Sequence, residues 1–450
     1  MGKHNWYQAF TAGFLALCLV PSAGMLLAGP EEAGGNEVRA AAPALVDGAG
    51  TLNTAYLTQL SDYVGDGFYP RQKLITAWSG LNAAIGASTV EDVVLGEDGW
   101  LYFGQTLDDY TGSDLLTERE IFSAARNLSL MQEYCNDLGA DFVFTVAPNK
   151  NSLYPENMPD LPMLSTGRNA DALAAALADE GVRYCDLFAA FGGQGETLYF
   201  AQDSHWNSKG AALAADAITA SLGRGTGYFA GPFAPVDDHV GDLYAMLYPA
   251  GGALETDQKY LGALGFTYDV PIRSAENQTI LTTGSGEGSL LLFRDSFGNL
   301  LYPYLADAFG SALFSRAMPY TLTLAADRPV DCVAVELVER NLDYLVRYLP
   351  VMPAPARLPA QTADAGGSVR LTAGDDGTLE GYVRITGTLD AAHDLRSGVY
   401  LCTEELWYEA FLLEDGAFGL YVPAEALGGA LAVAFSADGA LAAQPAVLQN

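Results

Sequence analysis

The stretch that decides the fold is Leu290-Leu291-Leu292-Phe293-Arg294-Asp295-Ser296-Phe297-Gly298. A short apolar run that ends in polar residues predicts a buried strand, followed here by a turn toward a helix. Ser296 lies at this turn, so we expect its hydroxyl at the carboxyl end of a sheet. Backbone N–H groups at the start of the next helix would lie close by, where they could stabilise an oxyanion.

Helix and strand patterns alternate on both sides of this stretch. Strand patterns cover residues 141–146, 182–187, 289–293 and 332–336, and helix patterns cover residues 117–138, 170–180, 208–222 and 299–309. Such alternation predicts an α/β sandwich with a mainly parallel sheet. In sheets of this kind, sites form beyond the carboxyl ends of the strands, where the segments of Asn149, Asp203 and Ser296 are expected.

The 450 residues are enough for two or three domains. After a Pro- and Ala-rich stretch, the pattern changes from alternating elements to short strands separated by Asp-Gly turns. The predicted division is a signal peptide or membrane anchor at 1–30, a flexible stalk at 31–50, an α/β domain with an N-terminal helical segment at 51–348, a linker at 349–367, and an all-β, sandwich-like module at 368–450.

The N-terminus has the composition of a secretory signal or an anchor. Lys3 precedes an apolar run from Phe10 to Gly29, and no Asp or Glu occurs before Glu31. Pro21 and the small residues near it are compatible with cleavage, whereas the length is compatible with retention. A buried helix is the alternative. Either of the first two interpretations places the rest of the chain outside the cytoplasm.

The charge excludes several classes of partner. There are 22 Lys and Arg residues against 55 Asp and Glu residues, which gives a net charge of −33. Such a surface repels nucleic acid and disfavours strongly anionic polymers and anionic membranes.

The five cysteines do not form a disulfide framework, although a Cys185–Cys332 bridge stays open. The spacing of Cys and His residues matches no metal-ligand pattern.

A second segment, Asp203-Ser204-His205-Trp206-Asn207, supplies what Ser296 would need as a nucleophile. A neutral imidazole can take the proton of a serine hydroxyl, and a carboxylate can fix the tautomer of that imidazole. In an extended segment Asp203 and His205 would point the same way and Ser204 away. The alternative is a structural histidine and a helix-capping Ser296. His239, the other candidate base, lies in an acidic loop and is expected to be solvated, with contact to the site as the alternative.

Several motifs resemble those of the DHHW proteins, which are related to the alginate O-acetylation proteins of the SGNH hydrolase superfamily. The segment 203–207 with Gly210 resembles a D-x-H-W-(N/T)-x-x-G signature. Further similar segments, in the expected order, are 36–39 with Pro43, 66–71, 96–102, 146–150 with 154–156, 241–244 and 336–341. The resemblance covers roughly residues 1–348, and the all-β module matches no family that we can name.

The resemblance implies an SGNH-like domain with Ser296 as nucleophile, His205 as base and Asp203 as the residue that orients the base. Two positions depart from the pattern, because Ser204 replaces a histidine and Arg294 replaces the glycine before Asp-Ser. Asn149, Arg294 and Tyr302 are candidates for oxyanion or substrate binding. For each of them a turn, core or surface role is the alternative. Trp206 is expected to pack beneath His205.

The implied activity is an extracytoplasmic O-acyltransferase or esterase that acts on hydroxyls of a cell-envelope or exported polysaccharide. The acyl donor would come from an acylated sugar or from a membrane acyltransferase. Acyl transfer through a serine needs no metal or organic cofactor, so none is expected. The rival hypothesis is a non-catalytic glycan-binding or scaffold protein that keeps the fold, with the all-β module holding glycan. The choice between transfer and hydrolysis depends on water exclusion, which the sequence does not reveal.

Overall fold

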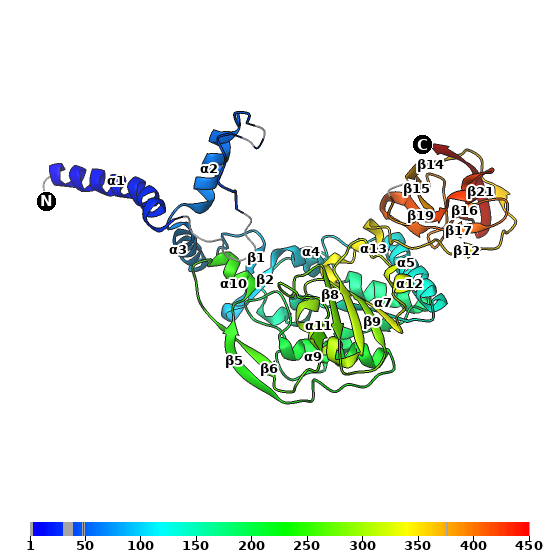
Figure 1. Ribbon diagram of the computed structural model, residues 1–450, viewed down its shortest axis with the longest axis horizontal. Helices are drawn as coiled ribbons and strands as arrows, with labels where there is room; N and C mark the ends of the chain where they lie inside the picture. The colour runs from blue at the N-terminus through cyan, green and yellow to red at the C-terminus, as the bar shows by residue number, and fades with distance from the viewer. Residues whose placement is uncertain (1–2, 30–38, 47, 49, 375–376, 450) are drawn as a thin grey trace.

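The central sheet has seven strands, and apolar side chains lie on both of its faces. Figure 1 shows strands β8 and β9 of this sheet together with helices α7, α9 and α11. The computed structural model describes residues 3–29, 39–46, 48, 50–374 and 377–449. In order across the sheet the strands are β4 (Tyr184–Cys185), β3 (Asp141–Ala147), β11 (Cys332–Val338), β9 (Ser289–Phe293), β10 (Ser311–Ser315), β8 (Thr279–Thr283) and β7 (Thr267–Tyr268). The first five pair in parallel, and β8 and β7 add an antiparallel edge. The predicted mainly parallel sheet is therefore confirmed.

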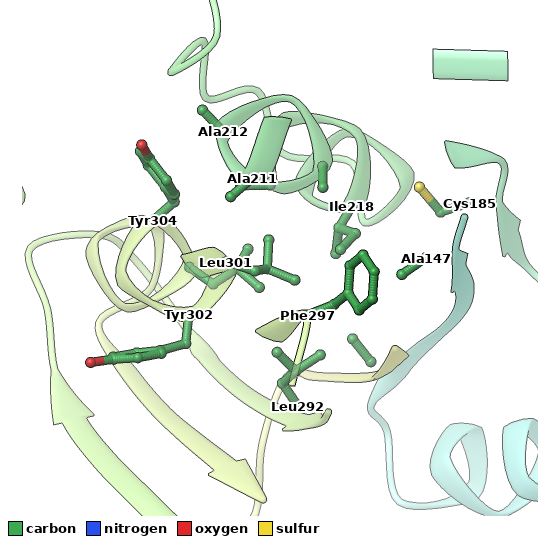
Figure 2. Packing of buried hydrophobic residues seen from close by; sticks show 14 of the residues in the cluster. Ala147, Cys185, Ala211, Ala212, Ile218, Leu292, Phe297, Leu301, Tyr302 and Tyr304 are labelled. Atoms are coloured by element: carbon green, nitrogen blue, oxygen red, sulfur yellow. The ribbon is translucent and has the colours of Figure 1, made fainter. Parts of the chain in front are cut away.

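The alternation of side chains along each strand builds two cores. Leu290 and Leu292 of β9 belong to one apolar cluster, whereas Leu291 and Phe293 belong to the other. On the first face the sheet packs against α8 (Leu187–Gly192), α9 (Ser208–Ser221) and α11 (Gly298–Ala308), part of which is seen in Figure 2. On the second it packs against α5 (Glu118–Asp137), α7 (Asn169–Asp179), α12 (Leu324–Asp327) and α13 (Tyr344–Arg347). Because both faces are covered, the strands are nearly uniformly apolar.

Shorter elements surround the carboxyl edge of this sheet. The segment 93–103 forms the antiparallel pair β1 (Val93–Leu95) and β2 (Leu101–Phe103). A separate two-stranded sheet joins β5 (Phe233–His239) to β6 (Glu255–Tyr260). The remaining helices of this region are α4 (Leu107–Thr111), α6 (Lys150–Leu153) and α10 (Asp242–Leu247), with short 3-10 turns η1 (Glu97–Gly99), η2 (Gly104–Thr106), η3 (Pro155–Asn157) and η4 (Glu339–Asn341).

The C-terminal region is all β, as predicted. Its ten strands are β12 (Ala356–Arg357), β13 (Ala363–Asp364), β14 (Val369–Gly374), β15 (Tyr382–Thr388), β16 (Val399–Cys402), β17 (Trp407–Glu409), β18 (Phe411–Leu412), β19 (Ala417–Pro423), β20 (Ala432–Ala437) and β21 (Ala440–Gln449), with 3-10 turns η5 (Glu414–Gly416) and η6 (Ala424–Leu427). The predicted linker at 349–367 contributes β12 and β13, and its Met352 is fully buried. The boundary between domain and module therefore stays a prediction.

The all-β region is joined to the α/β domain through α5. The side chain of Asn127 donates to the carbonyl of Leu412 at 2.8 Å and accepts from its N–H at 2.9 Å. Phe411 is fully buried in the apolar cluster on the α5 face of the central sheet. Arg126 bonds Glu409, which is 1% exposed. These contacts give the two regions a shared core.

The N-terminal part begins with α1 (Lys3–Ala28), which projects from the rest of the chain in Figure 1. Residues Trp6–Leu27 have a mean hydropathy of 1.9 and are long enough to cross a membrane. A signal sequence has the same properties, so both interpretations of this segment stand. The predicted helical segment is confirmed as α2 (Tyr56–Gly67) and α3 (Arg71–Ala83). Half of the predicted stalk, residues 31–38, 47 and 49, lies outside the described residues.

Candidate active site

Three chain segments that follow parallel strands meet at the carboxyl edge of the central sheet. Ser296 follows β9, Asn149 follows β3, and the turn η4 follows β11. These three strands are neighbours in the sheet, so their ends lie together. Ser296 is partly exposed at this edge, where a substrate can reach it, whereas Phe293 three residues earlier is fully buried.

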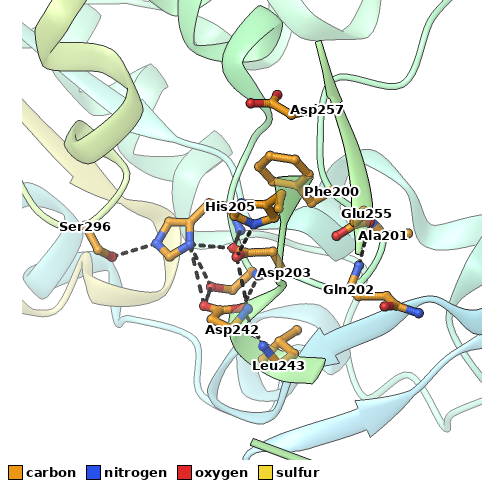
Figure 3. A network of polar contacts seen from close by, with 12 residues as sticks. Phe200, Ala201, Gln202, Asp203, His205, Asp242, Leu243, Glu255, Asp257 and Ser296 are labelled. Carbon is orange, nitrogen blue, oxygen red and sulfur yellow. Dashed lines mark hydrogen bonds and ion pairs between the residues drawn. The ribbon is translucent and has the colours of Figure 1, made fainter. Parts of the chain in front are cut away.

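The structure brings Ser296, His205 and Asp203 into one hydrogen-bonded series (Figure 3). The Oγ atom of Ser296 lies 2.9 Å from Nε2 of His205, and Nδ1 of the same ring lies 2.7 Å from Oδ1 of Asp203. Asp203 is 4% exposed, and the imidazole is partly open to solvent. In this geometry the serine hydroxyl donates to a neutral imidazole, whose other nitrogen donates to the carboxylate.

Protonation of these groups follows from their contacts. Burial raises the pKa of Asp203, but hydrogen bonds from His205 and His239 outweigh burial and hold this pKa well below its usual range. Burial lowers the pKa of His205, whereas its hydrogen bond to Asp203 and the charges of Asp203 and Asp242 raise it, with a net increase. Asp203 is therefore ionised, and His205 is more basic than a free imidazole.

Backbone contacts hold the loop that carries Asp203. The buried Nζ atom of Lys150 donates to the carbonyls of Phe200, Ala201 and Asp203, at 3.1, 2.9 and 2.6 Å. Burial lowers the pKa of this lysine to about 8. On the other side of the loop, Glu255 accepts from the N–H groups of Ala201 and Gln202. Lys150, the last residue of the similar segment 146–150, thus positions the acid of the series.

The expected orientation of Ser204 is wrong. The segment around it forms a bend rather than an extended strand, so Ser204 turns back toward the histidine. Its Oγ atom lies 3.1 Å from Nδ1 of His205 and donates to Oδ2 of Asp242 at 2.5 Å. Asp242, at the start of α10, lies 3.5 Å from the same ring nitrogen. The base therefore has a second carboxylate beside it.

His239 was expected to be solvated, and this expectation is also wrong. Its Nε2 atom lies 2.8 Å from Oδ2 of Asp203, and its ring stacks on Phe200 with centroids 3.8 Å apart. The N–H of Asp242 completes the set of donors to Oδ2, at 3.0 Å. One signal for this role was present in the sequence, because His239 precedes the segment 241–244 by two residues.

The predicted support of His205 by Trp206 takes an indirect form. The indole of Trp206 is fully buried, donates to the carbonyl of Phe297 at 3.1 Å, and meets that ring edge to face at 4.9 Å. The ring of Phe297 in turn lies 4.7 Å from the imidazole of His205. Trp206 therefore packs beneath Phe297, the residue next to Ser296. This contact connects the segment 203–207 to the segment that carries the serine.

Two of the candidate binding residues have structural contacts instead. The guanidinium of Arg294 donates to the carbonyls of Ala275 and Asp295 and to Oδ1 of Asn299, at 2.6, 3.2 and 2.7 Å, and the residue is 4% exposed. Tyr302 is 5% exposed and shares a hydrogen bond of 2.7 Å with Tyr268. Figure 2 shows its ring directed away from Phe297. Arg294 fixes a loop and Tyr302 belongs to the core, so neither contact supports substrate binding.

Asn149 is 1% exposed and faces acidic side chains. Its N–H donates to Glu339 at 2.8 Å, and its Nδ2 donates to Asp109 at 3.2 Å. Its Oδ1 atom is buried without a hydrogen-bond partner. The amide donor predicted for an oxyanion is thus engaged with Asp109, and an oxyanion role for Asn149 stays a prediction.

Sequence reasoning also missed Arg340 as an individual residue, although its segment belongs to the 336–341 motif. Its guanidinium lies over the rings of Phe103 and Phe297, 5.1 and 5.8 Å from their centroids. Burial lowers the pKa of Arg340, while Asp295 and Asp242 oppose this effect. A cation therefore lies close to the serine and histidine, and its field opposes protonation of His205.

One group of side chains at the site has the geometry to hold a cation. Ligand atoms of Asp203, His205 and Asp242 lie within 4.8 Å of one another. The same atoms already exchange hydrogen bonds, since Asp203 accepts from His205 and Asp242 accepts from Ser204.

Each of the five cysteines is a free thiol, so the Cys185–Cys332 bridge that the sequence left open is not formed.

In comparison with known proteins, residues 93–260 match the family model described as SGNH hydrolase-like domain, acetyltransferase AlgX. This match includes Asp203, His205 and Asp242 and ends before Ser296. It confirms the SGNH-like fold and the predicted relation to alginate O-acetylation proteins.

Among curated proteins, the chain is similar to a protein described as probable alginate O-acetylase AlgJ of Pseudomonas syringae pv. tomato, with 29% identity over 167 residues. The aligned part is 35% of this chain and spans 41% of that relative.

Among solved structures, the chain is similar to a DHHW family protein of Eubacterium siraeum, with 17% identity and a TM-score of 0.41. That match covers 56% of this chain and 94% of the other. A similar match is PatB1 of Bacillus cereus, with 16% identity, a TM-score of 0.43, and coverage of 56% and 96%.

Proposed function

We propose that this protein is a serine-dependent O-acyltransferase that acts on hydroxyl groups of a polysaccharide outside the cytoplasm. The observation that carries the proposal is the series Ser296 Oγ to His205 Nε2 at 2.9 Å and His205 Nδ1 to Asp203 at 2.7 Å. The related proteins, named as acetyltransferase and alginate O-acetylase, support the reaction class. The apolar helix α1 supports an extracytoplasmic location, as a signal or an anchor.

The first half of the reaction forms an acyl-enzyme. Ser296 Oγ attacks the carbonyl carbon of an acyl donor while its proton passes to Nε2 of His205. Asp203 accepts from Nδ1 and stabilises the imidazolium. The C–O bond to the leaving group breaks, and His205 returns the proton to the leaving oxygen. The acyl group then remains on Ser296 as an ester.

The second half transfers the acyl group to a sugar. The hydroxyl of the acceptor loses its proton to His205 as its oxygen attacks the acyl carbon, and the bond to Ser296 Oγ breaks as the proton moves to that oxygen. Water in place of the sugar gives hydrolysis. Two charged neighbours have opposite effects on the pKa of His205. The carboxylate of Asp242 raises this pKa, and the guanidinium of Arg340 lowers it.

The test is ester hydrolysis and serine labelling with the full chain. We expect the parent to hydrolyse p-nitrophenyl acetate and to react with a fluorophosphonate at Ser296. Ser296→Ala should abolish the labelling, and both Ser296→Ala and His205→Ala should lower hydrolysis at least about 100-fold. Ser285→Ala, at an exposed serine of another loop, is the matched control. Equal labelling and hydrolysis in all variants would exclude the proposal and favour a glycan-binding protein.

A further inference from the structure

A cavity of about 250 Å³ lies at the carboxyl edge of the sheet, next to the candidate active site. Its walls come from the region of α4, the turn η4 that follows β11, and the start of α13. Helix α4 and the turn η4 are far apart in the sequence and meet only in the folded chain. The proposed mechanism uses none of the wall residues as nucleophile, base or orienting acid, so the cavity has no role in it so far.

Arg340 connects this cavity to the serine and histidine. It lines the cavity, and its guanidinium lies over the ring of Phe297, the residue after Ser296. Among the described residues, this guanidinium forms no hydrogen bond or ion pair, although burial lowers its pKa. A partly buried guanidinium without a protein acceptor donates its hydrogen bonds to water or to a ligand in the cavity. A molecule bound to Arg340 in the cavity would therefore lie close to Ser296 and His205.

The walls of the cavity carry more negative than positive charge. Two arginines line it, Arg340 and Arg347, and Arg347 is already paired with Asp343 at 2.9 Å. The carboxylates that line it are Asp108, Asp109, Asp114, Glu339 and Asp343. A ligand that carries a carboxylate on each ring would meet this excess of like charge, which disfavours its binding.

Two of these carboxylates have free capacity to accept hydrogen bonds. Asp109 accepts from the amides of Asn149 and Asn169, at 3.2 and 3.1 Å, and Glu339 accepts from Asn149 N–H and from Ser152 Oγ. An ionised carboxylate has about four acceptor positions, so Asp109 retains room for a further donor, as does Glu339 above its raised pKa. Neither forms an ion pair among the described residues. Burial raises the pKa of Asp109 to about 6 and that of Glu339 to about 7.

From the shape, charge and position of this cavity we infer that it binds the acceptor sugar and selects a ring without a carboxylate, such as an uncharged or amino-substituted hexose. The inference rests on the proposed function. Hydroxyl or ammonium groups of the ring would donate to Asp109 and Glu339, and a ring oxygen would accept from Arg340. A uronic acid ring offers an anion where the walls already hold several, so it would be rejected.

The test is calorimetric binding to the full chain with Ser296→Ala, which removes the nucleophile and leaves the cavity intact. The probes are pentamers of N-acetylglucosamine, glucosamine and mannuronic acid. We expect the first two to bind at least about tenfold more tightly than the third. Asp109→Asn should lower the glucosamine-to-mannuronate affinity ratio about fivefold. Asp114→Asn, at an exposed position, should lower this ratio about threefold.

The matched control is Glu287→Gln, an exposed acid at the amino end of β9, on the opposite edge of the sheet from Ser296. It should leave the ratio unchanged. Mannuronate binding as tight as that of the other pentamers, or a ratio that none of the cavity variants changes, would overturn the inference. Sugar binding of the expected selectivity without any Ser296-dependent acyl transfer would instead disprove the proposed function, so the two failures are distinguishable.

Discussion

His239 donates from Nε2 to Oδ2 of Asp203 at 2.8 Å, on the carboxylate oxygen that His205 does not use. One carboxylate therefore accepts from two imidazoles at once. The face of His239 lies on Phe200, which fixes the ring. The pKa of His205 therefore depends on His239 through the shared carboxylate of Asp203. No contact of His239 with Ser296 or His205 is found among the described residues.

The first prediction concerns this second histidine. His239→Ala removes a donor and a cationic neighbour from Asp203, so Asp203 interacts more strongly with His205 and raises its pKa further. Because the reaction needs a neutral His205, the acid limb of the pH–rate profile should move up by about half to one pH unit. The rate at neutral pH should fall about tenfold. Ester hydrolysis between pH 5 and 9 measures both.

His239→Gln is the matched control for that change. Its amide can still donate to Asp203, but it carries no charge, so the loss of rate should be smaller than in the alanine variant. A pH profile that coincides with that of the parent in both variants would contradict the role of His239.

The second prediction has the opposite sign. Asp242 lies 3.5 Å from Nδ1 of His205, and its charge raises the pKa of that ring. Asp242→Asn keeps acceptors for the N–H groups of Ser204 and Leu243 but removes the charge. The acid limb should therefore move to lower pH by about half a unit. The same hydrolysis assay measures it, with the Ser285→Ala protein for comparison.

A shift of the Asp242→Asn profile to higher pH would show that Asp242 acts on His205 through structure rather than charge. The double variant with His239→Ala should fall between the two single profiles, because the two changes act on one titrating group.

The third prediction concerns stability and the buried Glu339, which is 2% exposed. A glutamate in the unfolded chain has a pKa of about 4.3. Burial raises the pKa of Glu339 in the folded chain to about 7. Between these values the folded state holds a proton that the unfolded state has lost, so the free energy of unfolding falls as pH rises from about 4.3 to about 7. The contribution is on the order of 3 kcal/mol.

Urea unfolding at pH 5, 6, 7 and 8 measures this slope. Glu339→Gln should flatten it, because the amide does not titrate, whereas Glu287→Gln should keep the slope of the parent. His205 and His239, whose pKa values are also raised, titrate in the same direction in all three proteins and therefore cancel in the comparison. Parallel slopes for the parent and Glu339→Gln would refute the assignment.

The fourth prediction concerns the union of the two regions. Glu409, 1% exposed, pairs with Arg126 of α5 at 2.6 Å and with Arg357 of β12 at 2.9 Å. Without the buried carboxylate of Glu409, Arg126 keeps only Glu180 and Arg357 keeps only Glu133, both of which are more exposed. Glu409→Ala should therefore lower the free energy of unfolding by about 3 kcal/mol. Glu414→Ala, at an exposed pair with Arg347, should change it by less than about 0.5 kcal/mol. Equal losses in urea unfolding would contradict the prediction.

The same contacts bear on how a glycan-binding role of the all-β region can be tested. Deleting the region after residue 348 would remove Phe411 from the core of the α/β domain and leave Asn127 without its partners on Leu412. A loss of binding on deletion would then reflect instability, so surface variants are the better test.

Local patterns were sufficient to predict the sheet and its edge. Leu290 to Phe293 is apolar at every position, which is typical of a parallel strand covered on both faces, and the polar residues after it mark the turn. Asp203 and His205 are two residues apart, so their proximity was expected. Their contact with Ser296, 91 residues further on, was inferred from a shared sheet edge and a resemblance, and the structure brings the three together.

Contacts that depend on how a side chain packs could not be predicted from the sequence. Arg294 and Tyr302 are close to Ser296 in sequence, yet the guanidinium turns to a loop at 275–277 and the phenol turns to Tyr268. The position of Ser204 depended on a bend where an extended segment was expected. Proximity to Ser296 in the sequence therefore wrongly suggested a binding role for these residues. The sequence did not reveal the role of Lys150, which donates to three backbone carbonyls.

The sequence by itself determined the order of strands and helices, the all-β C-terminal region, the acidic surface and the chemical types at the site, because periodicity and composition act locally. Tertiary structure alone decided that His239 shares Asp203, that Asp242 flanks the base, and that Arg340 and five carboxylates enclose one cavity. These residues come from loops and turns of different elements. Their distances depend on how the strands order in the sheet and how the helices pack on it, which no local pattern encodes.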